Sequence, residues 1–181
     1  MAPTPDQTMA SFLAAINGPG LGTMTASAAV TQLMAQFSSN PVVGITNGRG
    51  PVFTGITAVQ NLFTSLFIAF PNLSFGVVQP VPPLPSGAPS WLHSVETPTR
   101  VTVEAVLGGT HQGAWAPRGA PSSPINNVQP TNLPFTVDAC AIFSFDPNSG
   151  LITRLAVYFD RWKVMADLNI GYTPTGASPP F

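Results

Sequence analysis

Few side chains in this sequence can take part in acid–base chemistry, because charged residues are scarce. The 181 residues include seven Asp or Glu, six Lys or Arg and two His. Two of these residues stand out by their positions: Asp160 ends the apolar stretch 155–159, and His111 lies in the glycine-rich stretch 108–113. If both side chains face a pocket, a carboxylate and an imidazole could carry general acid–base catalysis near neutral pH.

Both residues also have ordinary structural interpretations. Asp160 precedes the stretch 161–165, which starts a predicted helix, and aspartate is a common N-cap residue. His111 shares the inward parity of Val103 and Leu107 if the strand runs on without a bulge, but a lone inward histidine is commonly a hydrogen-bonded core residue. The spacing therefore leaves a catalytic and a structural role open for each of them.

The composition excludes several classes of function. Only 7% of the residues are charged, against about 25% in typical domains, and the net charge is −1, so no basic surface for nucleic acid is expected. Polar residues interrupt the longest apolar stretch, 56–70, so no membrane-spanning helix is expected either. The first residues lack the basic and apolar regions of a signal peptide, which predicts a cytoplasmic protein. No phosphate-binding loop, dinucleotide-binding glycine pattern or metal-ligand spacing is present, so neither a cofactor nor a metal ion is expected.

Helical patterns occupy the first part of the chain. A helix is predicted from Pro5 to about residue 16, after a capping threonine and before the breaker sequence 17–20. Apolar residues at helical spacing predict two further helices, at about 26–37 and 56–70. A turn-rich sequence within 42–54 predicts a small hairpin between these two helices.

Strand patterns follow the helices. Alternating apolar residues predict four strands, at 73–77, 101–107, 135–145 and 151–160. The proline-rich stretch 80–89 is expected to be a stiff surface connection, and the long loop 117–134 either a lid or an arm that grips a partner. A short helix at 161–169 and a tail at 173–181 complete the chain. Helices first and strands afterwards indicate an α+β fold, in which the helices cover one face of a curved sheet.

Several short motifs occur in an order that resembles a known family. They are the sequences at 53–55 (Phe-Thr-Gly), 70–73 (Phe-Pro-Asn-Leu), 109–113 (Gly-Thr-His-Gln-Gly) and 150–152 (Gly-Leu-Ile), followed by the closing Asp160. Their order and spacing resemble the SnoaL-like polyketide cyclases of the nuclear-transport-factor-2-like superfamily, over roughly residues 12–168.

The resemblance implies a fold and a domain layout. It implies a cone-shaped α+β fold in which a curved, antiparallel-dominated sheet wraps around the three N-terminal helices and encloses a deep, mostly apolar pocket. Residues 1–181 would form a single SnoaL-like domain, with a core of about 8–169 and a tail at 173–181. Pockets of this kind bind small hydrophobic molecules.

The resemblance also implies roles for the two ionisable residues. In the cyclases, the aspartate that matches Asp160 is the general acid–base group acting on a substrate that forms an enol or enolate during ring closure. His111 is implied as a pocket-lining residue that assists it. The cyclases also use a histidine in the strand before the final turn, where this chain has the sequence Ile-Phe-Ser at 142–144.

These observations lead to two hypotheses about function. The first is a small-molecule enzyme of the cyclase, isomerase, dehydratase or hydrolase type, with Asp160 and His111 as catalytic residues acting on an apolar carbonyl-bearing substrate. The alternative is a non-catalytic module of the same fold, for ligand binding or assembly. In either case four aromatic residues are expected to bind the hydrophobic ligand: Trp115, Tyr158, Phe143 and Phe63.

A homodimer is the expected partner. No charged residue lies between Asp6 and Arg49, or between Arg49 and Glu96, so little in these long stretches favours an exposed surface. The outer face of the sheet is the surface expected to be buried in the dimer, as is common in the family that the chain resembles.

Overall fold

Four helices and seven strands are present in the part of the chain that the computed structural model describes, residues 2–45, 51–77, 94–97, 99–115 and 128–170. The helices are α1 (Pro5–Asn17), α2 (Ala26–Met34), α3 (Ile56–Ala69) and α4 (Arg161–Asp167). The strands are β1 (Phe37–Ile45), β2 (Val52–Thr54), β3 (Ser74–Val77), β4 (Ser94–Thr97), β5 (Arg100–Thr110), β6 (Pro134–Phe145) and β7 (Ile152–Phe159). The stretches 80–89 and 173–181, and residues 117–127 of the long loop, lie outside the described residues.

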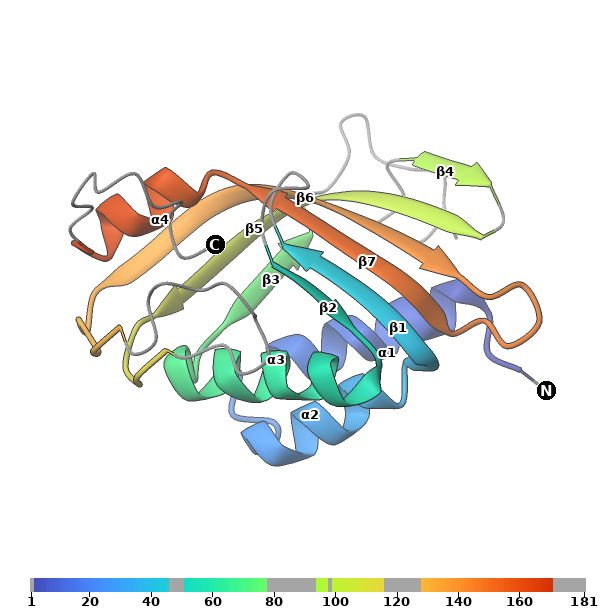
Figure 1. Cartoon of the computed structure of the whole chain (residues 1–181), viewed down its shortest axis with the longest axis horizontal. Helices are drawn as coiled ribbons and strands as arrows, with labels where there is room; N and C mark the ends of the chain where they lie inside the picture. The colour runs from blue at the N-terminus through green and yellow to red at the C-terminus, as the bar shows by residue number, and fades with distance from the viewer. Residues whose placement is uncertain (1, 46–50, 78–93, 98, 116–127, 171–181) are drawn as a thin grey trace.

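The strands form a mixed sheet in the order β2-β1-β7-β6-β5-β3, and β4 also pairs with β5. All of these pairings are antiparallel except that of β1 with β7. Helices α1, α2 and α3 lie together on one side of the curved sheet, while α4 follows β7 at one end (Figure 1). The predicted α+β class with an antiparallel-dominated sheet is confirmed.

Local sequence signals account for the start of α1. The backbone N–H of Gln7 donates to Oγ1 of Thr4 at 3.3 Å, and the backbone N–H of Thr4 donates to Oε1 of Gln7 at 2.9 Å. This reciprocal pair is a capping box, and Pro5 occupies the first helical turn, where its missing N–H costs nothing. Met9 and Phe12 then face the core from the buried side of the helix.

The prediction for the second helix is wrong at its end. We expected the helix to continue to residue 37, but α2 ends at Met34 and Phe37 is the first residue of β1. Sheet pairing determines this boundary, because the backbone N–H of Ile152 donates to the carbonyl of Gln36 at 2.8 Å and Phe37 pairs in register with Ile152. Phe37 is buried as its spacing suggested, but from a strand.

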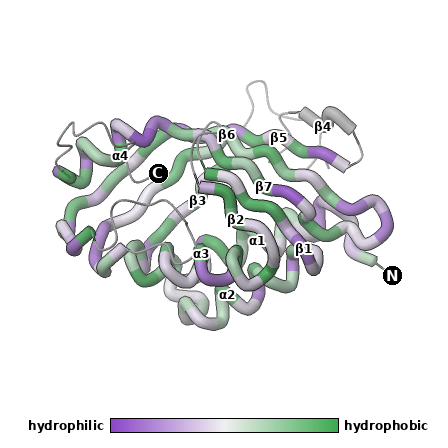
Figure 2. The backbone as a smooth tube through the Cα atoms, in the orientation of Figure 1, coloured by the Kyte–Doolittle hydropathy of each residue, from purple (hydrophilic) through white to green (hydrophobic). Residues whose placement is uncertain are grey.

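An aromatic cluster around Phe12 fills the core. Its ring contacts four other phenylalanine rings edge to face, with centroids 5.3–6.4 Å apart: Phe37, Phe63, Phe75 and Phe143. Such pairs stabilise a fold by about 0.5–1.5 kcal/mol each beyond the burial of their area. The cluster joins α1 and α3 to the concave face of the sheet. Hydrophilic residues collect instead in the turn between β6 and β7 (Figure 2). No helix in the described residues is long and apolar enough to cross a membrane.

Candidate functional site

An apolar cavity of about 110 Å³ lies between the concave face of the sheet and the helices. Its walls are formed by side chains from α1, α3 and α4 and from strands β1, β3, β5, β6 and β7. Every lining residue is apolar; they include Leu66, Phe70, Phe135 and Val157, which the sequence analysis did not name as ligand-binding residues. The signal for Phe135 and Val157 was present in the sequence, because both occupy inward positions of strands that alternate in polarity.

Of the four aromatic residues expected to bind the ligand, Phe63 and Trp115 line the cavity. Phe143 is fully buried and packs edge to face on Phe12 with centroids 5.3 Å apart, so it fills the core and does not line the cavity. Tyr158 is 37% exposed and is not among the lining residues. Strand alternation explains this placement, because its neighbours Val157 and Phe159 both line the cavity.

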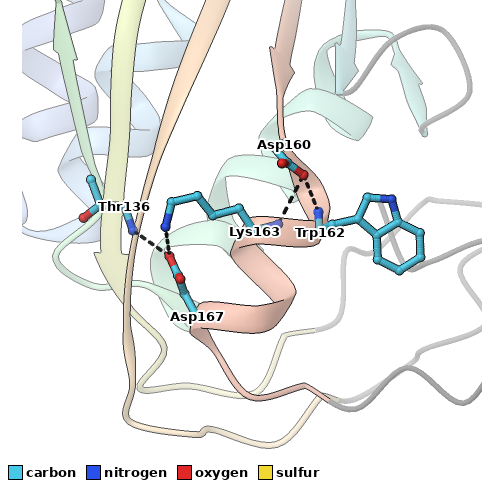
Figure 3. A network of polar contacts seen from close by, with 5 residues as sticks. All are labelled: Thr136, Asp160, Trp162, Lys163 and Asp167. Atoms are coloured by element: carbon cyan, nitrogen blue, oxygen red, sulfur yellow. Dashed lines mark hydrogen bonds and ion pairs between the residues drawn. The ribbon is translucent and has the colours of Figure 1, made fainter.

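Asp160 is the N-cap of α4 (Figure 3). Its Oδ1 accepts hydrogen bonds from the backbone N–H groups of Trp162 at 2.9 Å and Lys163 at 3.2 Å. The side chain is exposed and does not line the cavity, although Phe159 and Val164 on either side of it in sequence do. The structure thus places Asp160 at the junction of β7 and α4, beside the cavity wall and in a capping role.

A polar network holds α4 against the sheet. Nζ of Lys163 donates to Oδ2 of Asp167 at 2.8 Å, and the backbone N–H of Thr136 donates to the same oxygen at 3.4 Å (Figure 3). The hydrogen bond from Lys163, with a smaller contribution from Thr136, lowers the pKa of Asp167. Because Thr136 belongs to β6, its hydrogen bond to Asp167 links the C-terminal end of this helix to the sheet.

His111 is fully buried and directly follows the C-terminal end of β5. Its imidazole stacks at a tilt on Phe70 with ring centroids 5.3 Å apart, and its Nδ1 accepts a hydrogen bond from the backbone N–H of Thr131 at 3.3 Å. Burial lowers the pKa of His111, and the backbone of Gly113 opposes that shift only in part. The imidazole is therefore neutral at pH 7, with its proton on Nε2.

The glycine-rich stretch around His111 also has a structural role. The backbone N–H groups of Gln112 and Gly113 donate to the carbonyl of Ala69 at 2.8 and 3.2 Å, so this stretch caps the C-terminal end of α3. A Cβ atom on Gly113 would overlap the backbone carbonyl of Ile68, so only glycine fits there. The same stretch leads directly to Trp115 and so holds that side chain in the cavity wall.

The two candidate catalytic residues, Asp160 and His111, share no hydrogen-bond partner among the described residues. The described hydrogen bonds of Asp160 go to the N-terminus of α4, and those of His111 go to the stretch 131–133. His111 does not line the cavity, but Phe70 and Trp115 do, and Phe70 contacts its ring. Among the described residues, no group of three or more His, Cys, Asp or Glu side chains is placed to hold a metal ion.

Comparison with known proteins identifies the fold. No family model and no curated protein matches the sequence. A protein from Jannaschia sp. CCS1, assigned to the SnoaL-like polyketide cyclases, matches the structure with a TM-score of 0.62 and 16% identity, over 95% of this chain and 98% of that one. A protein with a ketosteroid isomerase-like fold from Catenulispora acidiphila, in complex with trimethylamine, matches with a TM-score of 0.60 and 18% identity, over 95% and 100% of the two chains. A protein from Xanthomonas campestris pv. campestris, also assigned as a polyketide cyclase, matches with a TM-score of 0.60 and 15% identity, over 91% and 96%. The chain therefore has the α+β cone fold of the SnoaL-like polyketide cyclases and the nuclear-transport-factor-2-like proteins.

Proposed function

We propose that this protein binds a small, predominantly apolar molecule in the cavity beneath the sheet. The observation that carries the proposal is the cavity wall, in which every lining residue is apolar. A cavity of about 110 Å³ approaches the roughly 150 Å³ of an engineered apolar cavity that stays dry and accepts benzene. A molecule with about one ring comes near this size, and a larger one would need the walls to move.

A binding experiment with a small hydrocarbon tests this proposal. Cyclopentane is titrated into the protein labelled with ¹³C at its methyl groups, and the NMR shifts of the lining residues are followed. Val157→Phe fills the cavity and is expected to weaken binding at least tenfold. Tyr158→Phe, which changes the neighbouring outward side chain, is the matched control and should bind as the wild type does. Equal binding by wild type and Val157→Phe would place the ligand elsewhere and refute the proposal.

A second function is acid–base catalysis on an apolar carbonyl compound, with Asp160 as the base. The position of Asp160 favours it, because the residues Phe159 and Val164 that flank it in sequence both line the cavity. Both cap hydrogen bonds end on Oδ1, so Oδ2 could accept a proton without breaking the cap, provided that the ligand extends from the cavity to the exposed carboxylate. The proton would leave the carbon next to the carbonyl, and the resulting enolate would later be reprotonated, so this chemistry needs no cofactor.

Hydrogen exchange in D₂O tests the catalytic role with a defined probe. Cyclopentanone exchanges the hydrogens next to its carbonyl slowly by itself, and the enzyme hypothesis predicts that the protein accelerates this exchange. Asp160→Asn keeps a side-chain oxygen for the cap but removes the base, so the acceleration should disappear while the melting temperature stays nearly unchanged. Undiminished exchange in Asp160→Asn would exclude Asp160 as the base, and no acceleration by the wild type would leave ligand binding as the function.

We also propose a homodimer that buries the outer face of the sheet. Asp138 on β6 and Glu104 on β5 both lie on this face and form its acidic end. Arg154 on β7 lies on the same face and forms its basic end, because it pairs in register with Ser144, which is further along β6. A second copy related by a two-fold axis that runs across the strands would place the acidic end of one face over the basic end of the other. The face is therefore complementary in charge to itself.

A further inference from the structure

His111 carries a buried hydrogen-bond donor that the described structure does not use. The backbone N–H of Thr131 points to Nδ1, so Nδ1 is the acceptor and the proton of the neutral ring is on Nε2. Nε2 is buried and has no hydrogen-bond partner within the described residues. The backbone of Gly113 lies close enough to the ring to oppose the lowering of its pKa, but it is not placed to accept a hydrogen bond from Nε2. Buried donors are nearly always satisfied in native proteins, so an unsatisfied one calls for an explanation.

The position of the imidazole suggests what satisfies it. The ring stacks on Phe70, and Phe70 lines the cavity together with Trp115 and Phe135. Phe70 contacts both of these rings, with centroids 6.0 Å from Trp115 and 5.2 Å from Phe135. The imidazole is thus one side chain removed from a cavity whose described walls are apolar, apart from the indole N–H of Trp115. A rotation of the Phe70 or Trp115 side chain is the movement that would bring a ligand to it.

We infer that His111 is the specificity-determining residue of the cavity, and that it selects apolar ligands bearing one hydrogen-bond acceptor, such as a carbonyl oxygen, over hydrocarbons of the same shape. This inference rests on the proposed binding function and adds the class of ligand to it. Nε2–H donates to the acceptor oxygen while the rest of the molecule contacts apolar walls. A site that loses its hydrogen bond when the acceptor is missing discriminates strongly, because the buried donor then stays unpaired.

The same geometry disfavours ligands whose polar group only donates hydrogen bonds and ligands that carry a negative charge. A ligand whose polar group only donates, such as an ammonium group, would meet Nε2–H with like polarity. A carboxylate would be buried against apolar walls without a cation in the described lining, at a high desolvation cost. A neutral ketone, aldehyde or ether remains as the chemistry that matches both the walls and the donor.

A two-by-two binding experiment tests the inference. Cyclopentane and cyclopentanone, which differ by one CH₂ in place of C=O, are titrated into wild type and His111→Phe, which retains an aromatic ring on Phe70 but has no donor. The cost of dehydrating the ketone is the same for both proteins and cancels. The ratio of the Kd for cyclopentane to the Kd for cyclopentanone should be about tenfold higher in the wild type than in the variant.

The outcomes separate this inference from the proposed function. If cyclopentane binds and the ratio is the same in both proteins, His111 does not select the ligand and only the inference fails. If neither molecule binds the wild type, both fail.

A measurement on the wild type covers the case in which His111→Phe does not fold. In protein labelled with ¹⁵N at its histidines, with resonances assigned by a His93→Gln variant, Nε2 of His111 should carry the proton. Cyclopentanone should shift the Nε2 and Hε2 resonances downfield, and cyclopentane should not. Resonances that stay unchanged at saturating cyclopentanone, or a proton found on Nδ1, would overturn the inference.

Discussion

The backbone N–H of Thr131 donates to Nδ1 of His111 across a distance of 3.3 Å, and this contact holds the imidazole in one neutral tautomer. Oγ1 of Thr131 lies 3.3 Å from the same nitrogen, and the backbone N–H of Leu133 donates to Oγ1 at 3.4 Å. The side chain of His111 thereby ties the end of β5 to the chain segment that enters β6. Protonation of Nδ1 would break this arrangement, because an N–H donor would then face an N–H donor.

The stability of the protein is expected to fall as the pH drops below the ordinary pKa of histidine, about 6.5. Burial lowers the pKa of His111 in the folded protein, so the unfolded chain binds more protons between that lowered pKa and 6.5. The contribution is complete above pH 6.5 and is lost as the pH falls toward the folded pKa. Urea unfolding at several pH values measures it, and His111→Phe should show a shallower dependence between pH 5 and 7 than the wild type. An equal slope in both proteins would contradict the lowered pKa.

Gly113→Ala is expected to destabilise the fold by about 1–3 kcal/mol, because the added methyl group would collide with the backbone carbonyl of Ile68 at the end of α3. Gly44→Ala in β1 is the matched control, since a Cβ atom there meets nothing within 4 Å. It should change the free energy of unfolding by less than about 0.5 kcal/mol. Chemical denaturation of both variants makes the comparison, and equal effects would show that the contact with α3 is not what requires glycine at position 113.

Asp160→Ala is expected to lower the free energy of unfolding by about 1 kcal/mol and the melting temperature by about 2–4 °C. The reason is the loss of the two hydrogen bonds that Oδ1 accepts at the start of α4. Asp160→Asn keeps a side-chain oxygen there and should melt within about 1 °C of the wild type. Thermal unfolding by circular dichroism measures both, and identical melting temperatures for wild type and Asp160→Ala would show that the cap contributes nothing.

Most elements could be predicted because their signals are local. The capping box at Thr4 and Gln7 and the alternation of apolar residues in β5, β6 and β7 need only neighbouring residues. The parallel pairing of β1 with β7 could not be predicted, because it joins segments more than a hundred residues apart. Phe37 was assigned to a helix for the same reason: its partner Ile152 cannot be recognised from the sequence around it.

The candidate site could be predicted only in part. The alternation along β7 already places Tyr158 opposite Val157 and Phe159, so its outward position followed from the sequence, whereas its aromatic character suggested the pocket. The two roles of Asp160 were equally compatible with its spacing, and only the hydrogen bonds to α4 show that it caps the helix. The orientation of His111 could not be inferred either, since it depends on Thr131, which follows the long loop.

Reversal of one charge on the outer face of the sheet is expected to weaken a homodimer. In the proposed arrangement Arg154 of one copy lies over the acidic end of the other, which carries Asp138. Arg154→Glu or Asp138→Arg would each bring like charges together and should raise the dimer dissociation constant roughly tenfold. The double variant restores opposite charges and should recover most of the affinity.

Sedimentation equilibrium at micromolar concentration, at low and high salt, measures these dimer affinities. Added salt should weaken the wild-type dimer, because the charges are exposed and screened. A wild type that sediments only as the 18.9 kDa monomer would refute the dimer. A dimer that both single variants leave intact would have to use a different face. The double variant is the decisive control, because a general loss of folding would not be repaired by a second charge reversal.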